Sequence, residues 1–312
     1  MIDEKACFHY DSLKGISKNP QFVRLTVCNS VQNRGFSYMR EVITAVYKEA
    51  LNMNHDNCTI LGSGSKANSY LFECGETLIA VDNGFSLKEF TARCARVGKD
   101  ARDIDYILVT HGHGDHIRGV AQLSQAARAP VFLNDEVALG PGSSRLFQRR
   151  RVSADLPLML GNIEIVPFRL HHDSPGAISY TIKFDGTAIT IITDTGCVSP
   201  EMGEHARDSD VLILEANYCP EMLQSGPYPV FLKKRIISDT GHLSNFDAIS
   251  FLNSLEGGER LKKVYFCHLS EVNNTPETLE ENIKADLRWP IEWSVCGRNE
   301  LVPVHLTDHF QT

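Results

Sequence analysis

The sequence lacks several features that would place it in a specialised class of protein. No uninterrupted apolar run approaches the length of a membrane span, and the first residues do not show the pattern of a signal peptide. The nine cysteines are scattered and form no Cys-x-x-Cys pair, which disfavours a disulfide framework and favours a reducing compartment. We therefore expect a cytoplasmic protein that makes no contact with a membrane.

Positive charge is also scarce. The 31 lysines and arginines are outnumbered by 39 aspartates and glutamates, and the formal net charge is -8. This balance argues against a protein that coats nucleic acid through bulk charge, although it leaves room for a local basic groove. A hydrophobic fraction of 42% and a charged fraction of 22% are ordinary for a globular enzyme.

The length of 312 residues allows one large domain or two small ones. The first part of the chain shows no sustained hydrophobic period, and only residues 38–51 have the apolar spacing of a helix. We expect residues 1–57 to form an N-terminal extension that is poorly ordered or partly helical. Residues 58–312 are expected to form the main domain.

A histidine-rich stretch, residues 110–119 (THGHGDHIRG), stands out in this domain. It places three histidines and one aspartate within six residues, directly after the apolar run 106–109 (YILV), which predicts a buried strand. Gly112 and Gly114 allow the backbone to turn tightly there. Neutral imidazoles and a carboxylate suit Zn²⁺, and they suit Mn²⁺ or Fe²⁺ somewhat less well.

Further histidines and aspartates recur where predicted strands end. Residues of this kind are His111, His172, Asp194 and His268. Each one alone is typical of a loop or turn, but together they indicate a common site, because ligands at strand ends are held rigidly by a packed sheet. The sequence therefore predicts a metal site.

Two short basic stretches interrupt the acidic background. Residues 145–151 (RLFQRRR) predict a solvated helix face, with a phosphate-contacting patch as the alternative. Lys233, Lys234 and Arg235 are candidates for substrate contact along a nucleic-acid backbone, and the alternative is again a solvated surface.

In these motifs the chain resembles the metallo-β-lactamase fold hydrolases. Its THGHGDHIRG stretch is similar to their signature motif, and the later histidines and aspartate follow in the expected order. Within that superfamily it looks most like the YycJ/WalJ type, over roughly residues 59–306. The matching stretches are GSGSKANSYLFE, LHHDSPGAISYTI, TDTG, ANYCPEML, KKRIISDTGHLSN and CHLSEVNNTPE.

The resemblance implies a fold and an activity. The expected fold is an α/β (α+β) four-layer αβ/βα sandwich with two mixed β-sheets and the metals at one edge. The expected activity is that of a dinuclear metal-dependent phosphodiesterase, a 5′→3′ DNA exonuclease linked to repair that uses a metal-bridging hydroxide. DNA is expected as the partner rather than RNA, and oligomeric state is not predicted. A small-molecule hydrolase of the same fold, acting on a cyclic phosphodiester, thioester or lactone, is the alternative, and a noncatalytic metal-binding module is a third possibility.

The resemblance also implies a set of ligands for two divalent cations, Zn²⁺ or Mn²⁺ with Fe²⁺ possible. One cation would be held by His111, His113 and His172. The other would be held by Asp115, His116 and His268, and Asp194 would bridge the two. The residues alone do not decide between His171 and His172, and the family pattern favours His172.

Further roles are expected around these ligands. Asp115 is expected to orient the attacking hydroxide, and His242 to bind the substrate phosphate or protonate the leaving oxygen, unless it merely begins a helix. Ser244 and Asn245 are candidates for substrate contact, or for capping the helix that follows. Two asparagines, Asn273 and Asn274, are candidates for fixing the ring of His268.

The chain departs from the family pattern at one place. Where related chains usually have Asn-His-Asp, this one has Asn217, Tyr218 and Cys219. Tyr218 is a poor metal ligand, while Cys219 is either a soft ligand or a small buried residue. This difference puts the substrate preference in doubt.

Overall fold

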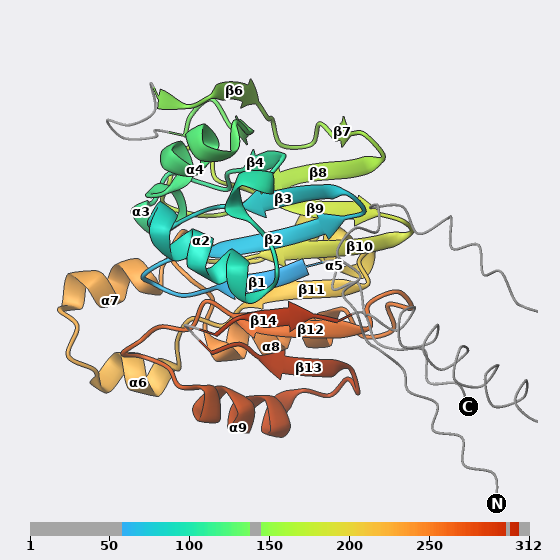
Figure 1. Ribbon diagram of the computed structural model, residues 1–312. Coiled ribbons are helices and arrows are strands. Elements are labelled where there is room, and N and C mark those ends of the chain that lie inside the picture. Colours follow the sequence, from blue (N-terminus) through green and yellow to red (C-terminus); the bar gives the residue numbers. More distant parts are fainter. Residues whose placement is uncertain (1–57, 138–144, 298–299, 306–312) are drawn as a thin grey trace, which may run out of the picture. The chain divides into compact units, whose positions relative to one another are not determined.

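The computed structural model describes residues 58–137, 145–297 and 300–305. The expected N-terminal extension, residues 1–57, lies outside the described residues. The described chain forms two β-sheets of seven strands each, with helices on their outer faces (Figure 1). Among the described residues, the helices are too short or too polar to cross a membrane.

The first sheet is mixed. It is antiparallel from β14 to β3 and parallel from β3 to β6. In spatial order its strands are β14 (Val302–Val304), β1 (Cys58–Gly62), β2 (Ser69–Cys74), β3 (Thr77–Val81), β4 (Tyr106–Leu108), β5 (Pro130–Leu133) and β6 (Gln148–Arg151).

The second sheet is also mixed. It is antiparallel from β7 to β10 and parallel from β10 to β13. In spatial order its strands are β13 (Glu292–Val295), β12 (Lys263–Cys267), β11 (Val211–Glu215), β10 (Thr187–Ile192), β9 (Ile178–Phe184), β8 (Ile163–Arg169) and β7 (Leu158–Leu160).

The sheets pack face to face, and their apolar side chains divide between an inner and an outer core. Along β11, Val211 and Ile213 belong to the cluster between the sheets, whereas Leu212 and Leu214 pack toward the helices. This alternation follows from the two-residue period of a strand. Strands that are apolar on both faces need cover on both faces, and the four-layer arrangement supplies it.

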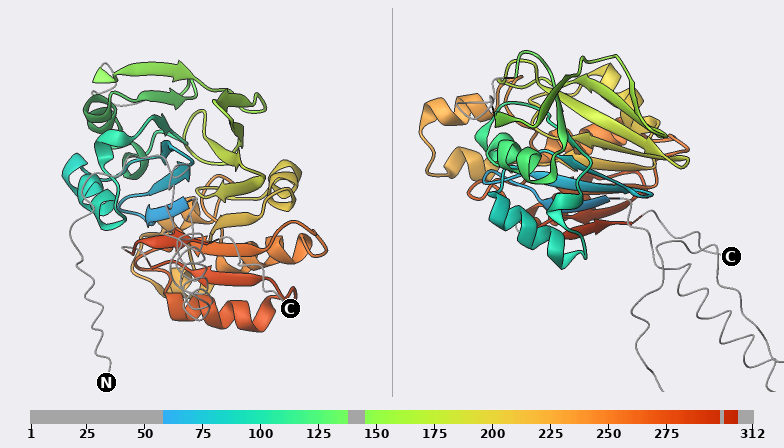
Figure 2. Two further views of the ribbon diagram at one scale, coloured as in Figure 1. Left: turned by 45° about the vertical axis from the view of Figure 1, so that its right-hand side comes forward. Right: turned by 45° about the horizontal axis from the view of Figure 1, so that its top comes forward.

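The helices form the two outer layers. On the first sheet, α2 (Leu87–Arg96) and α4 (Val120–Ala127) close an apolar cluster. On the second sheet, α5 (Pro200–Arg207), α8 (Asn245–Ser254) and α9 (Pro276–Asp286) close another (Figures 1 and 2). The expected four-layer αβ/βα sandwich with two mixed sheets is therefore confirmed.

The helix expected at residues 145–151 is wrong. Residues Gln148–Arg151 form strand β6, which pairs in parallel with β5 at the edge of the first sheet. Every residue of β6 is exposed, so no apolar period marks it in the sequence. The hydrogen-bonding edge of β5, rather than the local sequence, determines the conformation of this stretch.

Within each sheet, several strands run in the same direction and end at one edge of the sandwich. These strands are β3 and β4 in the first sheet, and β8, β10, β11 and β12 in the second. The segments that follow them gather at this edge. Short helices occupy this edge: α3 (Gly114–Ile117) follows β4, and α6 (Pro220–Ser225) and α7 (Val230–Ile236) follow β11 (Figure 1).

Candidate metal centre

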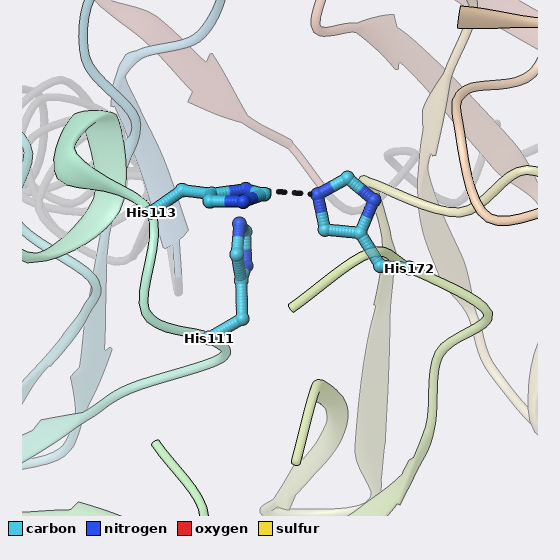
Figure 3. Close-up of side chains that lie close together, drawn as sticks. All are labelled: His111, His113 and His172. Atoms are coloured by element: carbon cyan, nitrogen blue, oxygen red, sulfur yellow. Dashed lines mark hydrogen bonds between the residues drawn. The ribbon is translucent and has the colours of Figure 1, made fainter. Parts of the chain in front are cut away.

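Three histidines face one another at this edge. His111 and His113 come from the loop between β4 and α3, and His172 comes from the loop after β8, on the other sheet (Figure 3). Nδ1 of His113 lies 3.0 Å from Nε2 of His172. Nitrogen atoms of all three rings lie within 4.8 Å of one another, close enough to bind one metal ion. His171, in contrast, is exposed and lies outside this group.

A second group lies beside the first. Asp115 and His116 are on α3, and His268 follows β12. The Nε2 atom of His116 is 3.7 Å from Oδ2 of Asp115, and ligand atoms of the three residues again lie within 4.8 Å of one another. The structure thus brings together both triplets that the family resemblance implied.

Asp194 lies between the two groups. Its Oδ2 is 3.3 Å from Nε2 of His116 and its Oδ1 is 3.4 Å from Nε2 of His268. It belongs to one group of possible metal ligands with His111 and His116, and to another with Glu215, His242 and His268. A carboxylate in this position can contact two cations at once.

The imidazole rings are oriented by contacts on their far sides. Four of them have Nδ1 within hydrogen-bond distance of an oxygen atom, which leaves Nε2 facing the cluster. The pairs are His111 with Thr110 Oγ1 (3.0 Å), His116 with Asp82 Oδ2 (2.8 Å), His172 with Gly241 O (3.2 Å) and His268 with Glu215 Oε1 (2.8 Å).

Backbone strain marks the same edge. Asp82, Asp194 and His268 each follow a strand and have left-handed φ angles of 57°, 61° and 56°. Residues with side chains rarely adopt this conformation, which costs about 1 kcal/mol or more for each. Gly84 adds a close approach, since a Cβ atom there would lie 1.8 Å from the carbonyl oxygen of Asp115. In these backbone conformations the side chains of Asp82, Asp194 and His268 point toward the histidine cluster.

Burial keeps part of the cluster neutral. Burial and the neighbouring His116 hold the pKa of His111 well below its ordinary value. Burial also lowers the pKa of His172. Both rings are therefore neutral near pH 7, the form in which an imidazole binds metal.

Neighbouring carboxylates raise the pKa of two other histidines, His116 and His268. Burial opposes a charge on His116, but Asp194 and Asp82 outweigh it and raise the pKa of His116 well above its ordinary value. In the same way, Asp194 and Glu215 outweigh burial and raise the pKa of His268 to about 9. Burial disfavours ionised Asp194, yet His268 and His116 lower its pKa. Protons here neutralise buried negative charge, a role that a divalent cation can take over.

The cluster fits divalent cations. Nε2 of His111, Nε2 of His268 and Oδ2 of Asp194 are buried and have no hydrogen-bond partner among the described residues. Buried polar atoms are normally paired, and atoms left unpaired in this way indicate an ion. Imidazole nitrogens mixed with carboxylate oxygens suit Zn²⁺, Mn²⁺ or Fe²⁺.

A cavity of about 340 Å³ opens over the cluster. His242 and Arg235 line it together with metal-ligand candidates such as Asp115 and His268. Nδ1 of His242 lies 2.7 Å from Oε1 of Glu215. Burial opposes a charge on His242, but Glu215 outweighs it and raises the pKa of this histidine. The raised pKa favours the protonated form of His242, with its Nδ1 directed at Glu215.

Arg235 ties α7 to the cluster. Its guanidinium group donates two hydrogen bonds to Asp173, one of them from Nη2 at 3.1 Å. Oδ1 of Asp173 in turn lies 3.5 Å from Nε2 of His113. The hydrogen bonds from Arg235 lower the pKa of Asp173. This chain of contacts positions His113 and places the Arg235–Asp173 ion pair in the lining of the cavity.

Two expected substrate residues have other roles. Ser244 caps α8, where its hydroxyl accepts from the backbone N–H of Asp247 and the Asp247 carboxylate completes a capping box. Asn245 is buried and bonds to Asn274 and Asn282. Neither residue lines the cavity, and Ser244 takes the alternative role of helix cap; substrate contact by either residue stays a prediction.

The basic triplet divides in a similar way. Arg235 lines the cavity, whereas Lys233 and Lys234 do not. Nζ of Lys233 donates to the carbonyl oxygen of Gln224 at 2.7 Å and so joins α7 to α6. Lys234 is exposed on the outer side of α7.

The departure at Tyr218 and Cys219 does not reach the metal cluster. Tyr218 packs with Leu223 and Ile236 beneath α6 and α7. Cys219 is buried and donates from Sγ to Glu221 at 3.0 Å. Among the described residues, neither belongs to a group that could hold a metal. Both residues support the two short helices instead.

Sequence reasoning missed the residues that orient the rings. Asp82, Glu215 and Asn68 contact the histidines, and the amide of Asn68 is 2.9 Å from Nε2 of His116. Asn217 contacts His268 through its side-chain amide, a role that had been expected of Asn273 and Asn274. The one available signal was a polar residue at the end of an apolar run, as for Asp82 after β3 and Glu215 in β11.

Comparison with known proteins agrees with this geometry. Residues 71–269 match the model of the beta-lactamase superfamily domain. The metallo-β-lactamase fold protein YhfI from Bacillus subtilis has the same fold, with a TM-score of 0.59 over 78% of this chain and 97% of that one, at 16% identity. The chain belongs to the metallo-β-lactamase superfamily and is a metal-dependent hydrolase.

Within that superfamily the chain belongs to the WalJ/YycJ family. It is 35% identical to exodeoxyribonuclease WalJ of Streptococcus pneumoniae, over 80% of this chain and 97% of the relative. It is 31% identical to exodeoxyribonuclease YycJ of Bacillus anthracis, over 80% of this chain and 94% of the relative.

Proposed function

We propose that this protein is a 5′→3′ DNA exonuclease that hydrolyses phosphodiester bonds with two divalent cations. The observation that carries the proposal is the pair of ligand groups sharing Asp194 beneath a cavity that also holds Arg235. Two cations and a guanidinium group match the negative charge of a phosphodiester. The names of the WalJ and YycJ relatives support DNA as the substrate.

Each ligand group would hold one Zn²⁺ or Mn²⁺ ion, with Fe²⁺ as a further candidate. His111, His113 and His172 are proposed for one ion, and Asp115, His116 and His268 for the other, with Asp194 shared. The bound cations would supply an acidified water and positive charge for the phosphate oxygens.

The chain's own residues would act on either side of the phosphate. Asp115 lines the cavity and its carboxylate can orient the attacking water by accepting a hydrogen bond. His242 keeps Nδ1 on Glu215, so its Nε2 can donate a proton to the leaving oxygen. The raised pKa of His242 favours the protonated form that this role needs.

A second cavity favours a long substrate over a small one. It has a volume of about 390 Å³ and shares the lining residue His172 with the first, so both cavities adjoin this proposed ligand. Arg151 and Arg169 line it, although Asp135 and Glu136 do so as well. A nucleic-acid strand can use both cavities, whereas a small molecule needs only one.

Digestion of end-labelled duplex DNA tests the proposal. The purified full chain, supplied with Mn²⁺ or Zn²⁺, should release nucleotides stepwise from the 5′ end and leave the 3′ label on progressively shorter strands. The variants Asp194→Asn and Asp115→Asn should reduce the rate by at least about 100-fold, because each removes a proposed ligand. Asp286→Asn, on an exposed residue of α9 outside both cavities, is the matched control and should retain near-normal activity.

Two results would contradict the proposal. Digestion from the 3′ end alone would refute the polarity while leaving the nuclease intact. Turnover of bis-p-nitrophenyl phosphate, dependent on Asp194 but without cleavage of DNA or RNA, would reassign the site to a small phosphodiester.

A further inference from the structure

Helix α7 presents an unusual outer surface. The side chains of Val230, Phe231 and Ile237 are 69%, 74% and 57% exposed. Beneath them, Leu232 and Ile236 pack on the small apolar cluster that holds α7 to the domain. The helix is therefore anchored on one side, and its apolar outer residues are left in solvent.

Phe231 lies next to the cavity over the metal cluster. Leu232, Arg235 and Ile236 from the same helix line that cavity. Phe231 precedes Arg235 by four residues, and side chains with this spacing are neighbours on one helix face. The Phe231 ring therefore stands one helical turn away from Arg235, whose guanidinium group is held by Asp173 in the lining of the cavity.

Charge on α7 indicates what covers this surface. Lys234 is exposed on the same outer side as Val230, four residues earlier, and Arg235 lies one residue further along. The whole chain carries a net charge of -8, so positive charge here is local. An aromatic ring beside lysine and arginine matches a nucleobase and its phosphate, because every base has a face for stacking.

We propose that α7 is a platform for an unpaired end of a nucleic-acid strand, with a terminal base stacked on Phe231 and its phosphate near Lys234. This proposal rests on the proposed nuclease function and specifies how that site receives its substrate. A strand end held on Phe231 lies beside Arg235 and can lead its first phosphodiester into the cavity. The platform acts in positioning rather than in chemistry.

The test uses an oligonucleotide with 2-aminopurine at its 5′ end and phosphorothioate linkages that resist cleavage. Stacking on an aromatic ring quenches the fluorescence of this base, so the signal reports the contact directly. With the full metal-loaded protein, we expect quenching on binding. Phe231→Ala and Phe231→Leu should lose most of the quenching and bind roughly tenfold more weakly, or about 1.4 kcal/mol.

Two variants provide the controls. Phe231→Tyr keeps the ring and should retain both quenching and affinity. Phe246→Ala removes another exposed phenylalanine, 63% exposed on α8 and outside the cavity lining, and should behave as the unaltered protein. Circular dichroism melting should show that all variants remain folded, since Phe231 contributes little to the core.

The outcomes separate the platform from the enzyme. If the unaltered protein degrades DNA but Phe231→Ala retains quenching and affinity, the platform is refuted and the nuclease stands. If light scattering shows a dimer that Phe231→Ala abolishes, a second copy covers this surface and the platform is again refuted. If the unaltered protein neither binds nor degrades DNA, both proposals fail.

Discussion

Glu215 connects two histidines that differ in their proposed roles. It is fully buried at the end of β11, and its Oε1 lies 2.7 Å from Nδ1 of His242 and 2.8 Å from Nδ1 of His268. Burial disfavours its ionised form, but His242 and His268 outweigh this and lower the pKa of Glu215. One carboxylate thus orients a proposed metal ligand and a proposed proton donor.

The variant Glu215→Gln should test this coupling. An uncharged amide holds the two imidazoles less strongly than a carboxylate does. Its NH2 group also cannot accept from the backbone N–H groups of Thr195 and Leu243, as Oε2 does, so the rings lose their fixed orientation. We expect metal affinity to fall by about 10- to 100-fold, as is usual when a partner of a ligating histidine is removed. Titration with Zn²⁺ against a competing chelator would measure it. Glu164→Gln, in a surface ion pair with Lys183, is the control, and equal affinity in both variants would contradict the role of Glu215.

Glu201 provides a test of pH dependence away from the metal cluster. A hydrogen bond with Asp155, with burial and the charge of Asp155 adding to it, raises the pKa of Glu201 from 4.5 to about 7. The folded state therefore holds this proton more tightly than the unfolded state does. The stabilisation that protonated Glu201 contributes is fully present below pH 4.5, and it is lost as the pH rises through about 7.

Glu201→Gln should remove this loss. The amide cannot ionise, so the variant should melt at a higher temperature than the unaltered protein at pH 8, and at nearly the same temperature at pH 4.5. Melting followed by circular dichroism at both pH values measures the difference. Glu256→Gln, on an exposed residue, should change neither melting temperature. A variant stabilised equally at both pH values would contradict the assigned cause.

Helix α8 gives a structural role to Ser244 and Asn245, which the sequence suggested as substrate contacts. Its first residues follow His242 directly, which is why Ser244 and Asn245 were expected in the site. The capping box of Ser244 and Asp247 instead satisfies backbone groups at the helix N-terminus. Asn245 bonds to asparagines near and within α9, so the two helices are joined by buried amides.

Ser244→Ala separates the two roles. Loss of the cap should lower the free energy of unfolding by about 1 kcal/mol and the melting temperature by roughly 2 °C. The KM for DNA should not change, because the hydroxyl does not reach the cavity. Ser199→Ala, which removes the cap of α5, should destabilise to a similar extent. A raised KM in Ser244→Ala alone would restore the substrate role.

The same distinction explains how much of the structure could be predicted from the sequence. Helix Val120–Ala127 and the cap of α2 at Ser86 were predictable, since their signals are local. Strand β6 was not, because Arg149 to Arg151 adopt a strand through pairing with β5. Glu215 and Asp82 were missed as partners of histidines because those contacts span 53 and 34 residues of chain.

At the scale of the whole molecule, the direction of the strands brings the residues of the site together. Both sheets place carboxyl ends at one edge, so residues far apart in sequence, from Asp82 to His268, meet there. The strained backbone of Asp82, Asp194 and His268 is stabilised by the four packed layers behind it. Because the net charge of the chain is -8, the proposed cations and the few basic residues at this edge would have to attract the proposed DNA substrate.

The most direct test of this account is anomalous diffraction from crystals grown with Mn²⁺ or Zn²⁺. We predict two separate anomalous peaks in the cluster, with Asp194 contacting both. The surrounding ligands should be His111, His113 and His172 at one peak, and Asp115, His116 and His268 at the other. A crystal with no peak in the cluster, or with its metal bound only elsewhere on the chain, would contradict the two-cation site.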